Sequence, residues 1–444
     1  MRKIGFILFI SFFFFNCSDK DDSLTPEPVV PQIKFVNTYG GSLNDVANDV
    51  INTNDGGYIV AGFTQSNDGD ISAKTGTDFD FWLLKFNNSD ELKWSKSFGG
   101  SATEKAFKII QTSDNGFAIA GYTDSHDGDV SENNGLSDIW ILKLDAIGNI
   151  LWEKSHGFSG IDQALSIIES SDNGFIVSGV IDVSASGGNG NDKYANKKHA
   201  GGDYWAIKLD SNGNKEWRRY FGGSFTDTAF DAIETNDNGF IIIGSSDSND
   251  VDISDNKGEY DFWAVKIDVN GILKWEKSYG GTQIDEAKSI AKSKEGDILI
   301  LGDSRSNDQD ISKPKGAADV WLVKISENGD LLWEKSYGGS SFDVGRHISP
   351  AQDGGFLLAG SSRSRDGDLI LNQGQNDAWI LKIDESGNLE WQKSIGGDEI
   401  DFAYGISQLQ DGSIIAVGET SSNSGDIVEN KGFSDVLIIK INVE

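Results

Sequence analysis

Apolar and polar residues alternate with a period of two in short stretches along almost the whole chain, and this pattern predicts β-strands. In residues 261–267, Trp263 and Val265 fall on one face and Phe262 on the other. Turn-forming residues follow at 268–271, and the alternation resumes over 273–279. The stretch therefore predicts two strands joined by a tight turn. All twelve tryptophans of the chain belong to such pairs, at positions 82, 140, 205, 263, 321 and 379 in the first strand and 94, 152, 217, 275, 333 and 391 in the second.

This strand pair is part of a longer unit that repeats. Each copy contains a strand with small residues, a turn such as Asp237-Asn238-Gly239, a continuous apolar strand such as 240–244, and then the two tryptophan strands. The copies are marked by a Gly-Gly pair at 40–41, 99–100, 222–223, 280–281, 338–339 and 396–397, with a degenerate one at 157–160. Four short strands per copy are typical of a propeller blade.

The two ends of the chain predict how the ring of blades closes. The last copy stops after its third strand, at 435–441, whereas residues 33–36 form a fourth strand that has no copy of its own. Sharing of these strands would remove two free sheet edges. The sequence therefore predicts an all-β fold: a seven-bladed β-propeller with four-stranded blades over residues 32–444, its last blade closed by the N-terminal strand.

The turn between the tryptophan strands has the form D-x-x-G-x-x-x-W, at 145–152, 210–217, 268–275 and 384–391. This form resembles the tryptophan motif of quinoprotein-like propellers and the repeats of bacterial β-propeller repeat proteins. The resemblance covers residues 33–444 and implies the fold rather than an activity. A quinoprotein dehydrogenase would be expected to have a vicinal cysteine pair, and Cys17 is the only cysteine of this chain.

The N-terminal segment has the features of a targeting signal. Arg2 and Lys3 precede an apolar run over 4–15, and Cys17 follows almost at once. This arrangement resembles a bacterial lipobox, which implies a signal peptide at 1–16 and lipidation of Cys17. The acidic stretch 18–22 resembles an export signal to the outer face of the outer membrane, and prolines stiffen a tether over 17–31. We therefore expect a surface lipoprotein, lipid-anchored in the outer membrane and facing the cell exterior.

Charge and acidic motifs bear on the possible partners. The net charge of −32 argues against nucleic acid as a partner, because such binding depends on neutralising phosphates. The loop between the second and third strands repeats pairs of aspartates, at Asp68 and Asp70, Asp127 and Asp129, Asp250 and Asp252, Asp308 and Asp310, and Asp366 and Asp368. Paired carboxylates suit calcium, the one cofactor that we consider, but the same residues could instead cap the backbone of their own loop.

Positions at which the copies differ are candidates for ligand binding, since the common scaffold does not dictate them. The residues aligned with Asn48 in the first strand are predicted to lie near the axis, although some of them could simply pack between blades; they are Phe107, Leu165, Phe230, Lys288, Arg346 and Tyr404. The third copy also carries an insertion at 183–202 that contains Lys193, Tyr194, Lys197, Lys198 and His199. We take Lys288, Arg346, Tyr404 and these five insertion residues as candidate ligand contacts, although the insertion could also be a solvated linker.

No motif in the chain indicates catalysis. The four histidines, at 126, 156, 199 and 347, lack the spacing of metal ligands, and no nucleophile elbow or phosphate-binding loop is present. The sequence favours a non-enzymatic binding module for a glycan or a protein. The alternative is a polysaccharide-acting enzyme, similar to an endoglucanase-type glycoside hydrolase, with its site on one propeller face.

Overall fold

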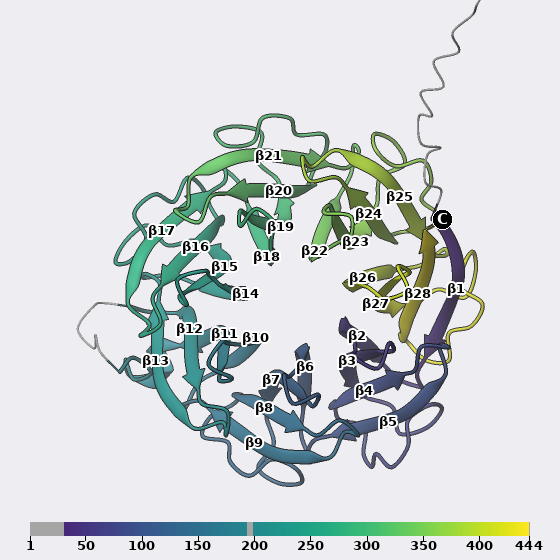
Figure 1. The fold of residues 1–444 in the computed structure, drawn as a ribbon, viewed down its shortest axis with the longest axis horizontal. Helices are drawn as coiled ribbons and strands as arrows, with labels where there is room; N and C mark the ends of the chain where they lie inside the picture. The colour runs from purple at the N-terminus through teal and green to yellow at the C-terminus, as the bar shows by residue number, and fades with distance from the viewer. Residues whose placement is uncertain (1–30, 193–198, 444) are drawn as a thin grey trace, which may run out of the picture.

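Four-stranded antiparallel sheets surround a central axis in the computed structural model, which describes residues 31–192 and 199–443 (Figure 1). There are seven such sheets, as the repeat predicts. Within the described residues the only helix is α1 (Val183–Ser186), in the loop that carries the third-copy insertion. No helix among these residues is long and apolar enough to cross a membrane.

The strands occupy four concentric positions. The innermost strands are β2 (Asp45–Asn52), β6 (Glu104–Gln111), β10 (Gln163–Glu169), β14 (Asp227–Glu234), β18 (Asp285–Lys292), β22 (Asp343–Pro350) and β26 (Asp401–Gln408). The second strands are β3 (Tyr58–Thr64), β7 (Phe117–Thr123), β11 (Phe175–Asp182), β15 (Phe240–Ser246), β19 (Ile298–Ser304), β23 (Phe356–Ser362) and β27 (Ile414–Thr420). The third strands are β4 (Asp80–Phe86), β8 (Asp138–Leu144), β12 (Gly202–Leu209), β16 (Asp261–Ile267), β20 (Asp319–Ile325), β24 (Asp377–Ile383) and β28 (Asp435–Val443). The outermost strands are β5 (Leu92–Phe98), β9 (Ile150–His156), β13 (Lys215–Phe221), β17 (Leu273–Tyr279), β21 (Leu331–Tyr337), β25 (Leu389–Ile395) and β1 (Pro31–Tyr39).

The chain ends share one blade, as the sequence predicts. Strand β1 pairs antiparallel with β28, from Pro31 opposite Val443 to Tyr39 opposite Val436. Figure 1 shows the purple β1 alongside the yellow β28. The seventh sheet therefore has the order β1-β28-β27-β26, and the closed ring leaves no blade incomplete.

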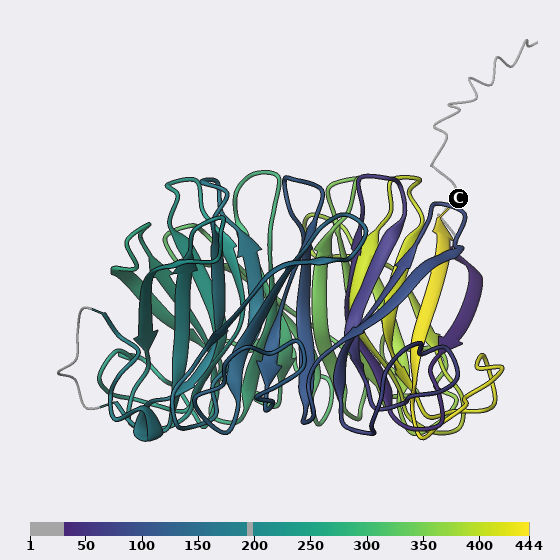
Figure 2. The ribbon, with the colours of Figure 1, turned by 90° about the horizontal axis from the view of Figure 1, so that it is seen from below.

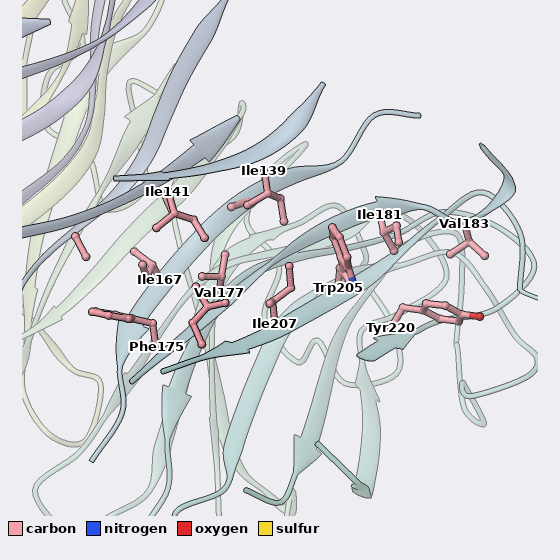
Figure 3. Packing of buried hydrophobic residues seen from close by; sticks show 14 residues of the cluster. Ile139, Ile141, Ile167, Phe175, Val177, Ile181, Val183, Trp205, Ile207 and Tyr220 are labelled. Atoms are coloured by element: carbon pink, nitrogen blue, oxygen red, sulfur yellow. The ribbon is translucent and has the colours of Figure 1, made fainter. Parts of the chain in front are cut away.

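The core lies between adjacent blades rather than within one sheet. Figure 3 shows one such cluster, in which Ile139 and Ile141 of β8 face Phe175, Val177 and other residues of the next blade. The third-strand tryptophans are the largest buried side chains, and five of them have no exposed surface. The second strands are buried along nearly their whole length, which explains their lack of polar alternation.

The D-x-x-G-x-x-x-W motif joins neighbouring blades. Gly271 has a φ of +70°, and a Cβ added there would lie 2.9 Å from Trp217 of the preceding blade. The same contact recurs between Trp275 and Gly329, whose φ is +81° and whose turn begins with Ser326 in place of the aspartate. Glycine is thus required twice over, by its left-handed backbone and by the outer tryptophan that packs on it.

The two faces of the ring differ in their connections. One face, here called the loop face, carries the long loops between second and third strands, including α1, and the other carries short hairpins (Figure 2). Strand β1 begins and β28 ends at the hairpin face. The innermost strands begin at the loop face, because Asp45 at the start of β2 bonds to Ser66 and Ser434 of the adjoining loops.

Candidate functional site

Every innermost strand carries a β-bulge at the same position. In β2, Ala47 lies opposite Gly62 and Asp49 lies opposite Ala61, so that Asn48 has no partner of its own in the register. The same shift occurs in the other six innermost strands. A bulge sets two residues against one on the neighbouring strand and redirects their side chains. The seven bulged residues, here called the mouth ring, are Asn48, Phe107, Leu165, Phe230, Lys288, Arg346 and Tyr404.

The mouth ring lines a cavity on the axis. All seven residues are half-buried, and together with five residues of a deeper layer they enclose a volume of about 170 Å³. The structure therefore brings Lys288, Arg346 and Tyr404 together, as the sequence predicts. Five of the ring residues come just before a deeper residue of the same strand, and the innermost strands begin at the loop face, so the ring lies on the loop-face side of that layer.

Contacts within the mouth ring combine aromatic and charged groups. The Lys288 Nζ lies 3.9 Å above the centroid of the Phe230 ring and 3.4 Å from Glu286 Oε1. The Tyr404 hydroxyl donates a hydrogen bond of 2.7 Å to Glu419. In the described part of the chain, the Arg346 Nε is buried and has no hydrogen-bond partner.

The deeper layer, here called the axial plug, consists of Asp49, Lys108, Asp231, Ser289 and His347. The Lys108 Nζ lies 3.6 Å from Asp231 Oδ2 and 3.4 Å from His347 Nε2, which reaches across the axis from another blade. The His347 Nε2 lies 4.0 Å from Asp49 Oδ1. Two serines donate to the Asp231 carboxylate, Ser166 at 2.8 Å and Ser289 at 3.2 Å. The plug therefore links the blades through a shared polar cluster.

Burial determines the protonation of the plug. It raises the pKa of Asp49, and it lowers the pKa of His347 to about 3, an effect to which the Lys108 charge adds. Burial alone would lower the pKa of Lys108, but the carboxylates of Asp231 and Asp49 hold it above its ordinary value. The plug thus contains a neutral imidazole and a lysine whose charge is compensated by its own neighbours.

The two cations of the mouth ring are in a different situation. Burial lowers the pKa of Lys288, Glu286 opposes this shift, and the Arg346 charge reinforces it. Behind them lies Asp303, whose pKa burial raises to about 6, although the charges of Lys288 and Arg346 pull it down. Asp303 does not line the cavity. The surface that the cavity presents at this point is therefore cationic.

The paired aspartates of the loops cap backbone amides. The Asp308 Oδ1 accepts from Thr282 N at 2.9 Å, and the Asp310 Oδ2 accepts from Gly280 N at 3.1 Å, both on the Gly-Gly segment. Equivalent bonds to this segment are made by Asp68, Asp70, Asp127, Asp129, Asp250, Asp366 and Asp368. Among the described residues no group of three or more His, Cys, Asp or Glu is arranged to hold a metal ion. The geometry thus favours the capping alternative, and calcium binding stays a prediction.

His199 occupies a seam between blades. Its Nδ1 lies 2.6 Å from Asp203 Oδ2 and its Nε2 lies 3.7 Å from Asp252 Oδ2 in the next blade, with a side chain that is 2% exposed. The lysines four residues before the third-strand aspartate in other copies form the same link, Lys257 to Asp310, Lys315 to Asp368 and Lys431 to Asp70. His199 thus takes the place of a lysine in an inter-blade contact that recurs around the ring. The other insertion candidates, Lys193, Tyr194, Lys197 and Lys198, lie outside the described residues.

Comparisons with known proteins support the fold. No family model matches the chain. The chain is 20% identical over 405 residues to the regulatory protein FlaEY of Caulobacter vibrioides, a match that covers 82% of this chain and 41% of that protein. It thus spans less than half the length of this curated relative.

Two solved propellers resemble the whole ring. The WD40 β-propeller domain of Doa1 superposes with a TM-score of 0.51 at 12% identity, over 93% of this chain and 97% of that one. The WD40 domain of Neurospora crassa Pan2 gives a TM-score of 0.51 at 9% identity, over 93% and 96% of the two chains. At these identities the likeness concerns the fold alone.

Proposed function

We propose that the protein is a surface-anchored lipoprotein whose propeller is a non-enzymatic binding module for a glycan or a protein, and that the mouth ring contacts the ligand. The observation that carries this proposal is the axial cavity itself. Seven equivalent backbone positions line it with six kinds of side chain, while the position just before each of them is alanine in six blades and glycine in the other. Side chains that vary on a fixed scaffold are suited to recognition rather than to stability.

The position of the chain ends supports the orientation in this proposal. Strand β1 begins at the hairpin face (Figure 2), and the mouth ring lies on the loop-face side of the axial plug. A tether over residues 17–31 that ends in a lipid on Cys17 would attach at the hairpin face. The loop face and the mouth ring would then point away from the membrane, toward extracellular ligands.

Binding at the axis can be tested by filling the cavity. The full chain, purified in detergent, is passed over immobilised polysaccharides and cell-surface proteins, and both retention and release of reducing ends are measured. We expect retention without cleavage, and loss of retention in Leu165→Trp, because the larger side chain would occupy the cavity. The matched control is Leu332→Trp on the outer strand β21, where the side chain is already exposed. Equal retention of wild type and Leu165→Trp would contradict binding at the axis, and cleavage would favour the hydrolase alternative.

Anchoring can be tested separately in cells. Replacement of Cys17 by Ala is expected to abolish incorporation of labelled fatty acid and to release the protein from the membrane fraction, because no other cysteine is available. Unchanged labelling of Cys17→Ala would contradict the lipoprotein proposal without affecting the axial site.

A further inference from the structure

The mouth ring concentrates positive charge in a strongly acidic protein. Of its seven residues, Lys288 and Arg346 are cationic and none is acidic, whereas the chain as a whole carries a net charge of −32. The two cations come from adjacent innermost strands, β18 and β22, and the charge of Arg346 helps to lower the pKa of Lys288. Two like charges held together at a partly buried site repel each other, and an anion between them would relieve this repulsion.

Arg346 also has an unused donor. Its Nε is buried and has no hydrogen-bond partner among the residues that the structure describes, although its side chain lines the cavity. The same atom is engaged in two other arginines: the Arg218 Nε donates to Asp192 at 3.2 Å, and the Arg363 Nε donates to Asn376 at 2.5 Å. A buried guanidinium donor without a partner costs stability, and a carboxylate is the group that fits its forked geometry.

The nearby carboxylates Glu286 and Asp303 do not occupy the place of an anion between Lys288 and Arg346. Glu286 lies 3.4 Å from the Lys288 Nζ and thus compensates part of the lysine charge. Asp303 is buried behind the cavity wall, and burial raises its pKa. Neither residue lines the cavity. The carboxylates that do line it, Asp49 and Asp231, belong to the axial plug, where Asp231 pairs with Lys108, so the mouth ring itself keeps its positive character.

The remaining ring residues indicate what carries the anion. Phe107, Phe230 and Tyr404 offer aromatic surface, and Asn48 offers an amide, around a cavity of about 170 Å³. At about 30 Å³ per water, this volume holds roughly six waters, which is the scale of one monosaccharide ring. Apolar faces next to charged hydrogen-bonding groups suit a sugar, which has apolar C–H faces and a polar rim.

We propose that Lys288 and Arg346 form a subsite for the carboxylate of an acidic sugar residue, with the aromatic side chains of the mouth ring against the sugar ring. This inference rests on the proposed binding function and names the ligand class of the same site. Lys288 supplies a point charge and Arg346 supplies a forked pair of donors, so that both contribute to affinity and Arg346 also fixes the orientation of the carboxylate.

The test uses the full chain in detergent and three probes: a uronic-acid trisaccharide, the corresponding neutral trisaccharide, and a short acidic peptide. We expect calorimetric binding of the uronic-acid probe, a weakening of its affinity by about tenfold or more in either Lys288→Gln or Arg346→Gln, and steep weakening with salt. The controls Lys313→Gln and Arg365→Gln remove the same charges from exposed loop positions and are expected to bind like wild type. Melting curves of each variant establish that it is folded.

The outcomes distinguish failure of the acidic-sugar subsite from failure of ligand binding at the axis. Equal affinity for the neutral probe, or unchanged affinity in both ring variants, overturns the acidic-sugar subsite while binding at the axis still stands. Preference for the acidic peptide overturns the sugar assignment. If Arg346→Gln does not fold, Arg346→Lys is used instead; it keeps the positive charge but lacks the forked pair of donors, so it is expected to bind more weakly than wild type. A second measurement is the nitrogen-15 chemical shift of the Arg346 Nε, which is expected to change when the uronic acid is added. If the protein binds the uronic acid and this shift does not change, the subsite is overturned. The proposed function itself fails if Leu165→Trp and wild type retain all ligands equally, or if the wild type cleaves the polysaccharide.

Discussion

Neutralising one buried carboxyl at a blade seam should change how stability depends on pH. Asp261, at the start of β16, has no exposed surface, and burial raises its pKa to about 7, an effect to which Asp285 of the next blade adds. The Asp261 Oδ1 has no hydrogen-bond partner within residues 31–192 and 199–443. Between the unfolded pKa of about 3.9 and the folded pKa of about 7, the native protein therefore holds a proton that the unfolded chain has released.

The sign and size of the effect follow from this difference. Because the native state binds more protons in this window, its free energy of unfolding falls as pH rises, by about 1.36 kcal/mol per pH unit per group. From pH 5 to pH 8 the Asp261 contribution amounts to about 2–3 kcal/mol. Asp261→Asn keeps an acceptor for the Lys257 amide and cannot ionise. Between pH 5 and pH 8 the free energy of unfolding of this variant is therefore expected to fall by about 2–3 kcal/mol less than that of the wild type.

The assay is urea unfolding at pH 5 and pH 8, followed by tryptophan fluorescence, with Glu295→Gln as a control at an exposed position. A parallel loss of stability in wild type and Asp261→Asn would refute the argument that burial of this carboxyl is responsible. Burial also raises the pKa of other carboxyls at the blade seams, that of Asp203 to about 7 and that of Asp227 to about 6. We therefore expect maximal stability at mildly acidic rather than neutral pH.

Three further predictions concern the ring. Deletion of residues 31–40 removes β1 and exposes the edge of β28, so the melting temperature is expected to fall by more than loss of an unpaired tail would cause; an unaltered melt would contradict closure by β1. Gly329→Ala is expected to lower the free energy of unfolding, measured in urea, by about 2–3 kcal/mol, because both the φ of +81° and the nearby Trp275 oppose a methyl group. The control Gly412→Ala, with a φ of +85° and open space around it, should lower it by about 1 kcal/mol. Equal losses would show that the tryptophan contact is unimportant. Removal of divalent metal with a chelator is expected to leave the melt unchanged, because backbone amides already occupy carboxylates such as Asp308; a lower melt would favour calcium in these loops.

The fold could be predicted because its signals are local and repeated. The alternation around Trp263 and the turn at 268–271 each depend on a few consecutive residues, and seven copies make the pattern unambiguous. The mouth ring could be predicted for the same reason, since alignment of the copies on Asn48 locates one position in each innermost strand. The tryptophan motif was visible as well, but the reason for its glycine, a contact with the preceding blade, required the structure.

The axial plug could not be predicted from period-two alternation. That pattern turns the residue after each ring position away from the axis, whereas the bulge brings both residues to the cavity. The contact of Lys108 with His347 joins residues 239 positions apart, and no local pattern encodes it. The inter-blade contact of His199 did leave a signal in the sequence, because His199 stands four residues before Asp203 as Lys257 stands before Asp261. The irregular length of the insertion obscures this equivalence.

The pairing of β1 with β28 also constrains when the protein can finish folding. These strands come from opposite ends of the described chain, so their contacts span the greatest sequence separation in the ring. During synthesis or export, β1 emerges first and has no partner until β28 follows, whereas each of the first six blades can assemble from neighbouring segments as it appears. Joining of the ends is therefore expected to be the slow step of folding, and until it occurs β28 offers an unpaired edge to other chains.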